Sequence, residues 1–290
     1  MTRIWCSLVT YLLVSVVAGS LLTWLVYPLA GVTFERTFTR AVLLFCAVGL
    51  FVLWRLWRLD RATLGLADQP RANRLSIARA YLLALLVLLP LTGAYLWLGY
   101  HVADGRVDWV GLEIWSSIAL IFAAAWLVST FEELVFRGAV YGAMRRHAGP
   151  VAVAITTSVL YTLVHFFDRS VAVATQDAWW SGIAWTWAAS AGLVAPLGYW
   201  DAATTLFLMG LILCWLRERF GLWVCVAVHA AWVFGLRTFK EGTIRDVVHP
   251  HAYLFSDYDH FTGIAATTYL VLVLLGVLAW RAMWPARSID

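Results

Sequence analysis

The sequence predicts an all-α fold: a polytopic membrane helix bundle of about eight transmembrane helices. Of its 290 residues 62% are hydrophobic and 13% are charged, whereas soluble domains carry about 25% charged residues. Several apolar runs reach the roughly 20 residues that cross a bilayer as a helix. The 18 tryptophans indicate the same class, because tryptophan concentrates where membrane meets water.

Eight apolar segments are expected to span the membrane. In chain order they cover residues 5–28, 39–57, 79–100, 113–134, 150–167, 201–216, 220–237 and 263–283. The fourth is expected to continue as helix to Arg145 and Arg146, which makes it about 33 residues and roughly 50 Å long. Such a helix either projects beyond the bilayer or bends, and Gly138 is the expected place for a bend.

The charges indicate membrane topology and no nucleic-acid partner. The net charge of +4 comes almost wholly from arginine, since Lys240 is the only lysine, and the arginines flank apolar segments as the positive-inside rule requires. The most basic connection, residues 55–79, is expected to be cytoplasmic, and alternating spans then place both termini there. We expect an integral membrane protein in the lipid bilayer of the cytoplasmic (inner) membrane of a prokaryote.

The four cysteines show no spacing typical of a metal or redox site. Cys6, Cys46, Cys214 and Cys225 all lie within apolar runs, and no CxxC pair is present. They are expected to be small buried side chains, not disulfides or zinc ligands.

Two adjacent carboxylates, Glu132 and Glu133, interrupt the fourth apolar span. An ionisable group in hydrocarbon costs several kcal/mol, so it persists mainly where it has a partner or a function. On an α-helix Glu133 and Arg137 are i, i+4 and share a face, so an ion pair is expected. Glu132 points about 100° away from that face and is left available.

Two histidines within later spans are the expected companions of Glu132. The turn after the fourth span falls near Gly149–Pro150, with Glu132 about 17 residues before it and His165 about 16 after it. Antiparallel helices closed there would bring the two side chains to the same depth. His229 lies about nine residues into the seventh span. Alone it would be a core histidine, but the Glu132–His165 pairing favours a functional role.

This set of side chains suits hydrolysis of a peptide bond in a membrane-embedded or membrane-adjacent substrate. A buried carboxylate can act as general base on water, and a neighbouring histidine can orient that water. A second histidine can donate a hydrogen bond to the oxyanion of the tetrahedral intermediate.

Two other classes are alternatives. Glu132, His165 and His229 also form a possible two-histidine, one-carboxylate zinc set for a membrane protease, although the sequence contains no HExxH. A non-enzymatic transporter or scaffold is the second alternative, because membrane proton relays also use Glu and His. A transporter should show two related halves with broken helices, and the sequence shows no such halves.

Three short motifs resemble those of the CPBP family, the CAAX-protease and bacteriocin-processing group of intramembrane glutamic endopeptidases. EELVFR, residues 132–137, matches its EExxxR motif, and YTLVH resembles its FxxxH motif with Tyr161 in place of Phe and ends at His165. His229 is similar to the histidine of its HxxxN or HxxxD motif. The sequence departs from the family at Val233, where Asn or Asp is common.

The resemblance implies a metal-independent, glutamic-type membrane peptidase that needs no cofactor. Glu132 would activate water with the help of His165, His229 would lie at the oxyanion site, and Glu133 and Arg137 would support the site. Because the side chain at position 233 cannot hydrogen-bond an oxyanion, three explanations are open: another donor compensates, the third motif differs in this branch, or activity is weakened.

The resemblance also sets the expected domain and partners. A single membrane-embedded domain is expected over residues 1–290, with residues 113–240 as its catalytic core. The implied partner is a membrane-anchored peptide or protein substrate. Prenylated C-termini, leader peptides and sorting tails are alternative substrates, and the sequence predicts neither the membrane face of the site nor an oligomeric state.

Overall fold

The predicted all-α membrane bundle is confirmed by the computed structural model, which describes residues 2–66, 74–167, 171–259 and 261–283. Among these residues, six helices are long and apolar enough to cross a membrane. Two shorter apolar helices, Pro150–His165 and Ile264–Ala279, coincide with the fifth and eighth predicted spans. Every predicted span is therefore helical, and six of them have the length and composition of a membrane span. Residues 67–73 of the basic connection lie outside the described residues.

The chain divides into two compact units, each built from two separate stretches of sequence. Unit 1 takes its residues from 1–67 and 134–198, and unit 2 from 68–133 and 199–290. The expected single domain over the whole chain stays a prediction.

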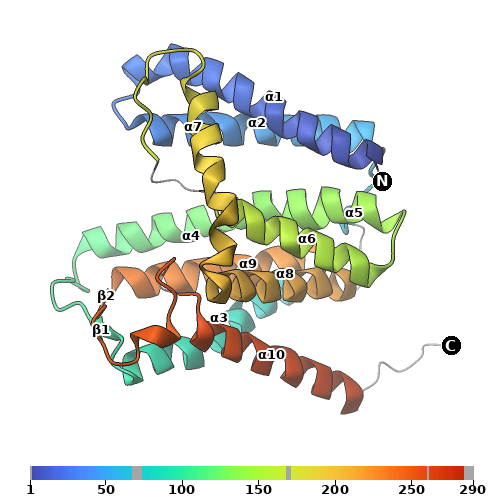
Figure 1. Ribbon diagram of the computed structural model, residues 1–290. Coiled ribbons are helices and arrows are strands. Elements are labelled where there is room, and N and C mark those ends of the chain that lie inside the picture. The colour runs from blue at the N-terminus through green and yellow to red at the C-terminus, as the bar shows by residue number, and fades with distance from the viewer. Residues whose placement is uncertain (1, 67–73, 168–170, 260, 284–290) are drawn as a thin grey trace. The chain divides into compact units, whose positions relative to one another are not determined.

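Unit 1 contains the first two spans and the segment after the glutamates. Its elements are α1 (Thr2–Val26), η1 (Tyr27–Leu29), α2 (Phe34–Leu56), η2 (Leu134–Val140), α5 (Tyr141–Arg145), α6 (Pro150–His165), α7 (Ser181–Ala189) and η3 (Ser190–Leu197). The helices α1 and α2 lie side by side (Figure 1), and the Tyr11 hydroxyl donates to the Cys46 carbonyl at 2.7 Å. Pro150 begins α6 at a position where its missing N–H costs nothing.

The short helix α5 is held by the connection that follows α2. The Arg146 guanidinium donates to the carbonyls of Trp57 and Arg58, both at 2.7 Å. Gly142 lies so close to this connection that a Cβ there would come within 2.4 Å of the Thr63 carbonyl oxygen. These contacts fix the end of the segment that carries Arg137.

Unit 2 contains the third, fourth, sixth, seventh and eighth predicted spans, up to Glu133 in the fourth, and a small sheet. Its elements are α3 (Arg74–Trp97), β1 (His101–Ala103), α4 (Leu112–Glu133), α8 (Trp200–Phe220), α9 (Leu222–Glu241), β2 (Thr243–Arg245), η4 (Ala252–Leu254) and α10 (Ile264–Met283). The helix α9 contacts α3, α4 and α8. In its most apolar stretch 56% of the residues are buried, against 11–33% for the other five candidate spans. A histidine on α9 is therefore a core residue of this unit.

The helices α4 and α9 run side by side in opposite directions (Figure 1). The last residue of α4, Glu133, contacts His229 in the first half of α9. At the other end, a Cβ on Gly242, just after α9, would come within 2.7 Å of the indole of Trp109, just before α4. Residues four positions before Glu133 and four after His229 therefore lie at the same level.

The helix that carries the glutamates continues beyond them, as the sequence predicted. The elements α4, η2 and α5 form one helical run of 34 residues from Leu112 to Arg145. The middle segment η2, which contains Gly138, is π-helical. A π-helical turn has i→i+5 hydrogen bonds and is frequent at functional sites. The i, i+4 spacing used to predict a shared face for Glu133 and Arg137 therefore does not apply within η2.

The prediction for the cysteines is correct at three positions and wrong at one. All four are free thiols, and Cys46, Cys214 and Cys225 are buried, but Cys6 is exposed. An apolar run does not distinguish the lipid-facing side of a membrane helix from its buried side, because both are apolar.

Candidate active site

The two glutamates differ sharply in their surroundings. The side chain of Glu133 is fully buried, whereas that of Glu132 is 25% exposed. Both lie in the last turn of α4, in unit 2. Because neighbouring helix positions point about 100° apart, one carboxylate faces the packed interior while the other reaches its edge.

Glu133 accepts two hydrogen bonds from α9. The Nδ1–H of His229 donates to Oε1 at 2.8 Å, and the Cys225 thiol donates to Oε2 at 3.0 Å. Cys225 and His229 are i, i+4 on α9 and therefore share a face. His229 is itself 4% exposed. A buried carboxylate bound to one ring nitrogen fixes the orientation of the imidazole and directs its other nitrogen elsewhere.

That other nitrogen faces Glu132. His229 Nε2 lies 4.0 Å from Glu132 Oε2, which is too long for a hydrogen bond. The structure therefore brings Glu132, Glu133 and His229 together, with His229 between the two carboxylates. The sequence analysis assigned Glu133 to Arg137 and did not foresee its bond to His229.

Several buried polar atoms near Glu132 have no hydrogen-bond partner among the described residues. On α4 these are Glu132 Oε2, Ser129 Oγ and Trp126 Nε1. Ser129 is fully buried and lies one turn before the glutamates, at the level of Val233 on α9. An unsatisfied buried polar atom costs about 1–3 kcal/mol, so three of them on one stretch of helix indicate a place for a polar ligand.

Unit 1 holds the other predicted residues, arranged around Tyr161. The Arg137 guanidinium carbon lies 4.3 Å from the centre of the Tyr161 ring, and Arg137 is fully buried. Phe136 meets the same ring edge to face at 5.6 Å. The His165 Nδ1–H donates to the Tyr161 carbonyl at 2.7 Å, and the two rings are 4.3 Å apart. Tyr161 thus positions both Arg137 and His165.

The sequence analysis predicted five site residues and did not foresee the contacts of three others. Tyr161 was noted only as a departure from a motif, Cys225 only as a small buried side chain, and Ser129 not at all. Helical spacing held the missing signal, since Ser129 and Cys225 each lie four residues before a site residue. The Glu133–Arg137 ion pair and the Glu132–His165 pairing stay predictions, because each joins a residue of unit 2 to one of unit 1.

A zinc set is not assembled within either unit. Among the described residues no group of three or more His, Cys, Asp or Glu side chains is arranged to hold a metal ion. The zinc alternative combines Glu132 and His229 of unit 2 with His165 of unit 1, so it stays an alternative.

Comparison with known proteins gives one match. Residues 114–235 match the family model described as "Type II CAAX prenyl endopeptidase Rce1-like". This segment includes all five predicted site residues, and the match confirms the resemblance to the CPBP family. No curated protein and no solved structure matches the chain. Over this segment the chain is therefore similar to the CAAX-type intramembrane endopeptidases.

Proposed function

Since residues 114–235 match the CAAX prenyl endopeptidases, we propose that this protein is a metal-independent glutamic endopeptidase that cleaves a membrane-associated or C-terminal-tail substrate. The observation that carries the proposal is the 4.0 Å separation of Glu132 Oε2 and His229 Nε2. The carbonyl carbon of a tetrahedral intermediate carries two oxygen atoms. A separation of this size allows one oxygen to form a hydrogen bond with Glu132 and the other to form one with His229.

Glu132 is the proposed general base. Its carboxylate takes a proton from water, and the water oxygen attacks the carbonyl carbon of the scissile peptide bond. The same carboxyl group then gives the proton to the leaving nitrogen as the carbon–nitrogen bond breaks. Glu132 suits this role because its side chain is partly exposed and its Oε2 has no hydrogen-bond partner among the described residues, whereas Glu133 is fully buried and accepts from His229.

His229 is the proposed oxyanion donor, through Nε2–H. Because its Nδ1–H already donates to Glu133, this role requires the imidazolium form, in which both ring nitrogens carry a hydrogen. Its partner Glu133 keeps Nδ1 occupied, so the ring turns Nε2 toward Glu132. His165 is proposed to assist the water, on the basis of the family motif and of its expected depth opposite Glu132. Arg137 is proposed to support the site electrostatically from its position against Tyr161.

Ser129 is the proposed replacement for the polar residue that the family has at position 233. Val233 offers no hydrogen-bond donor, but Ser129 lies at the same level on the facing helix. Its hydroxyl is buried and has no partner among the described residues. A second donor beside His229 would complete the oxyanion site.

A cleavage assay with purified protein in proteoliposomes tests the function. A peptide ending in a prenylated CAAX tail and its unprenylated counterpart are the substrates. We expect Glu132→Gln to lower kcat at least about a hundredfold, while the unfolding midpoint changes little. The matched control is Glu113→Gln in the exposed first turn of the same helix, which should cleave like the wild type.

The alternatives predict other outcomes. A zinc protease would lose activity to a chelator and would contain metal in stoichiometric amount. A transporter or scaffold would cleave neither peptide. A cleaving wild type that lost nothing on Glu132→Gln would rule out the proposed base. In the native host, the precursor that accumulates with Glu132→Gln identifies the substrate as a prenylated tail, a leader peptide or a sorting tail.

A further inference from the structure

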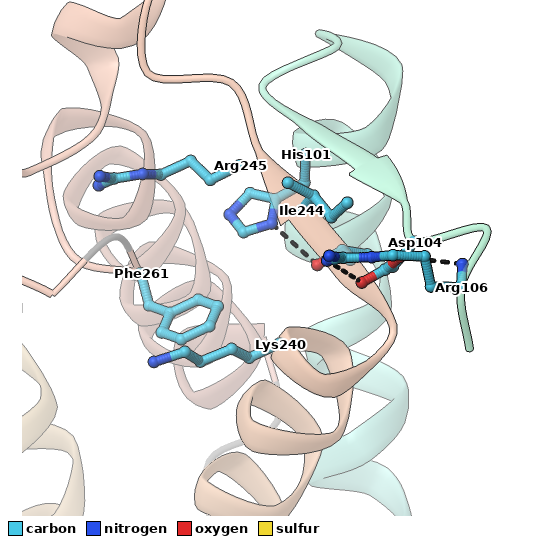
Figure 2. A pocket seen from close by; sticks show the side chains of 8 residues that line it. His101, Asp104, Arg106, Lys240, Ile244, Arg245 and Phe261 are labelled. Carbon is cyan, nitrogen blue, oxygen red and sulfur yellow. Dashed lines mark hydrogen bonds and ion pairs between the residues drawn. The ribbon is translucent and has the colours of Figure 1, made fainter. Parts of the chain in front are cut away.

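A basic pocket lies at the opposite end of α9 from the candidate active site, within unit 2. It has a volume of about 270 Å³ and is lined chiefly by His101, Asp104, Arg106, Lys240 and Arg245. Pockets for drug-sized ligands are about 300–1,000 Å³, so this one suits a small head group. Figure 2 shows Arg245, Lys240 and the free edge of the His101 ring directed toward the same side of β2.

The two-stranded sheet places two of these side chains together. In the antiparallel pair β1–β2, His101 lies directly opposite Arg245. Directly opposed residues point to the same face of a sheet. His101 Nε2 and Arg245 Nη1 are both buried and have no hydrogen-bond partner among the described residues. Two unsatisfied polar atoms that line one pocket indicate a ligand that bonds to both.

The charges in this pocket favour an anion. Arg106 is occupied by Asp104, to which its Nε and Nη2 donate at 2.9 Å each, so this pair adds no net charge. Neither Lys240 nor Arg245 forms an ion pair with any described residue. The last carbonyl groups of α9 would oppose an anion, but those of Thr238 and Phe239 accept from Gly242 N–H. Two positive charges are therefore available to a ligand.

His101 indicates that the anion also carries a hydrogen-bond donor. The Thr243 hydroxyl donates to the Phe239 carbonyl at 2.8 Å, so it accepts from His101 Nδ1–H at 2.9 Å. Burial, and next the charge of Arg245, lowers the pKa of His101 to about 4. At neutral pH the ring is therefore neutral, and Nε2 is a hydrogen-bond acceptor. A phosphate monoester supplies anionic oxygens for the cations, and its monoanion also carries a P–OH that can donate to Nε2. Its second pKa of about 6 lies close enough to neutrality for the monoanion to form.

The surroundings place this pocket at head-group level. The candidate spans α3 and α9 both end beside it, and Trp97 and Trp109 near these ends are 85% and 48% exposed. Exposed tryptophans at span ends mark the membrane–water interface.

The C-terminal carboxylate of a substrate bound at the candidate active site would be too far away to occupy this pocket. His229 and Lys240 are eleven residues or about 16 Å apart along α9, whereas three extended residues beyond a scissile bond reach at most about 11 Å.

We propose that the pocket of His101, Lys240 and Arg245 binds the phosphate monoester head group of a membrane lipid. The site is separate from the candidate active site, and its occupation does not depend on the proposed peptidase function. Lipid bound there would anchor the β1–β2 end of unit 2 at the membrane surface.

Thermal unfolding of the detergent-solubilised protein tests the proposal. Phosphatidic acid is the probe, and diacylglycerol of the same chain length is the control ligand without phosphate. We expect phosphatidic acid to raise the unfolding midpoint of the wild type in a saturable way. The apparent affinity should fall about tenfold or more in Arg245→Gln and in Lys240→Gln. Arg237→Gln, an exposed cation on the same helix outside the pocket, should bind like the wild type.

Three results would overturn parts of the proposal. Equal stabilisation by diacylglycerol, or an unchanged affinity in Lys240→Gln, would refute the phosphate site. Lys240 is exposed, so this variant keeps the test valid even if Arg245→Gln unfolds. Stabilisation by inorganic phosphate alone, at equal affinity and with the same dependence on both cations, would refute the lipid as the source of the phosphate.

Discussion

His229 Nδ1 and Glu133 Oε1 are 2.8 Å apart, and both side chains are buried. Glu133 also accepts from the Cys225 thiol, so its removal takes away the acceptor of His229 Nδ1–H and one of the two acceptors of the thiol, the other being the Leu213 carbonyl at 3.3 Å. We expect Glu133→Leu to lower the free energy of unfolding by about 3 kcal/mol and to abolish cleavage. In Glu133→Gln the side-chain carbonyl still accepts from His229, so both losses should be smaller. Denaturation and cleavage measured on the same preparations test whether Glu133→Leu has the larger effect. Equal effects of the two substitutions would contradict the prediction.

Ser129 should matter for catalysis and little for stability. Its hydroxyl has no partner among the described residues, so Ser129→Ala breaks no hydrogen bond within that part of the chain. If Ser129 donates to the oxyanion, the same change should lower kcat about ten- to a thousandfold with little change in KM. Adding Val233→Asn should restore part of that loss by placing a donor on the facing helix.

The matched control for this prediction is Ser256→Ala. Ser256 is also buried, but its hydroxyl donates to Asp201 and accepts from the Tyr258 N–H. This variant should unfold more easily, by about 1 kcal/mol, with unchanged kcat. A Ser129→Ala protein that keeps full activity but loses stability would show that Ser129 is only structural.

The aromatic ring at position 161 should be required, and its hydroxyl should not. The Arg137 guanidinium lies 4.3 Å from the ring centre, and a desolvated cation–π contact contributes about 2 kcal/mol. Tyr161→Phe keeps the ring and creates the FxxxH form of the motif, so cleavage should persist. Tyr161→Leu should lower both stability and kcat, because it removes the ring from Arg137 and from Phe136. Denaturation and cleavage assays of the two variants test this prediction. Equal stability and equal kcat in Tyr161→Phe and Tyr161→Leu would contradict it.

The stability of the protein should depend on pH through His101. Its pKa is lowered to about 4 from 6.5 by burial and by Arg245; the other titratable side chains against the ring are Tyr95 and Tyr100. Between pH 4 and pH 6.5, His101 binds a proton in the unfolded chain but not in the folded protein. Stability is therefore full above about pH 6.5 and falls as the pH is lowered toward 4, by at most about 3 kcal/mol.

His101→Gln is the variant for this pH test. It has no such titration, so its unfolding midpoint should change less than that of the wild type between pH 7.5 and 4.5. Identical pH profiles for the two proteins would show that His101 does not titrate as described.

The length of the apolar runs predicted much of the fold. The polar residues inside those runs predicted much of the candidate site. The helical run through Glu132 and Glu133 to Arg145 was predicted correctly. Its π-helical segment was not, because a widened turn depends on how the neighbouring chain packs. The exposure of Cys6 was missed for a similar reason, since lipid-facing and buried helix faces are both apolar.

The sequence by itself determined the class of the protein and the polar residues to examine. Length and apolarity suffice for a membrane helix, and a carboxylate in hydrocarbon needs a reason to be there. Only the tertiary structure decided that Glu133 binds His229 and Cys225, that Ser129 lies level with Val233, and that His101 faces Arg245. Each of these pairs joins residues far apart in the chain. Their contact depends on how α4 packs against α9 and how β1 pairs with β2, which no local pattern specifies.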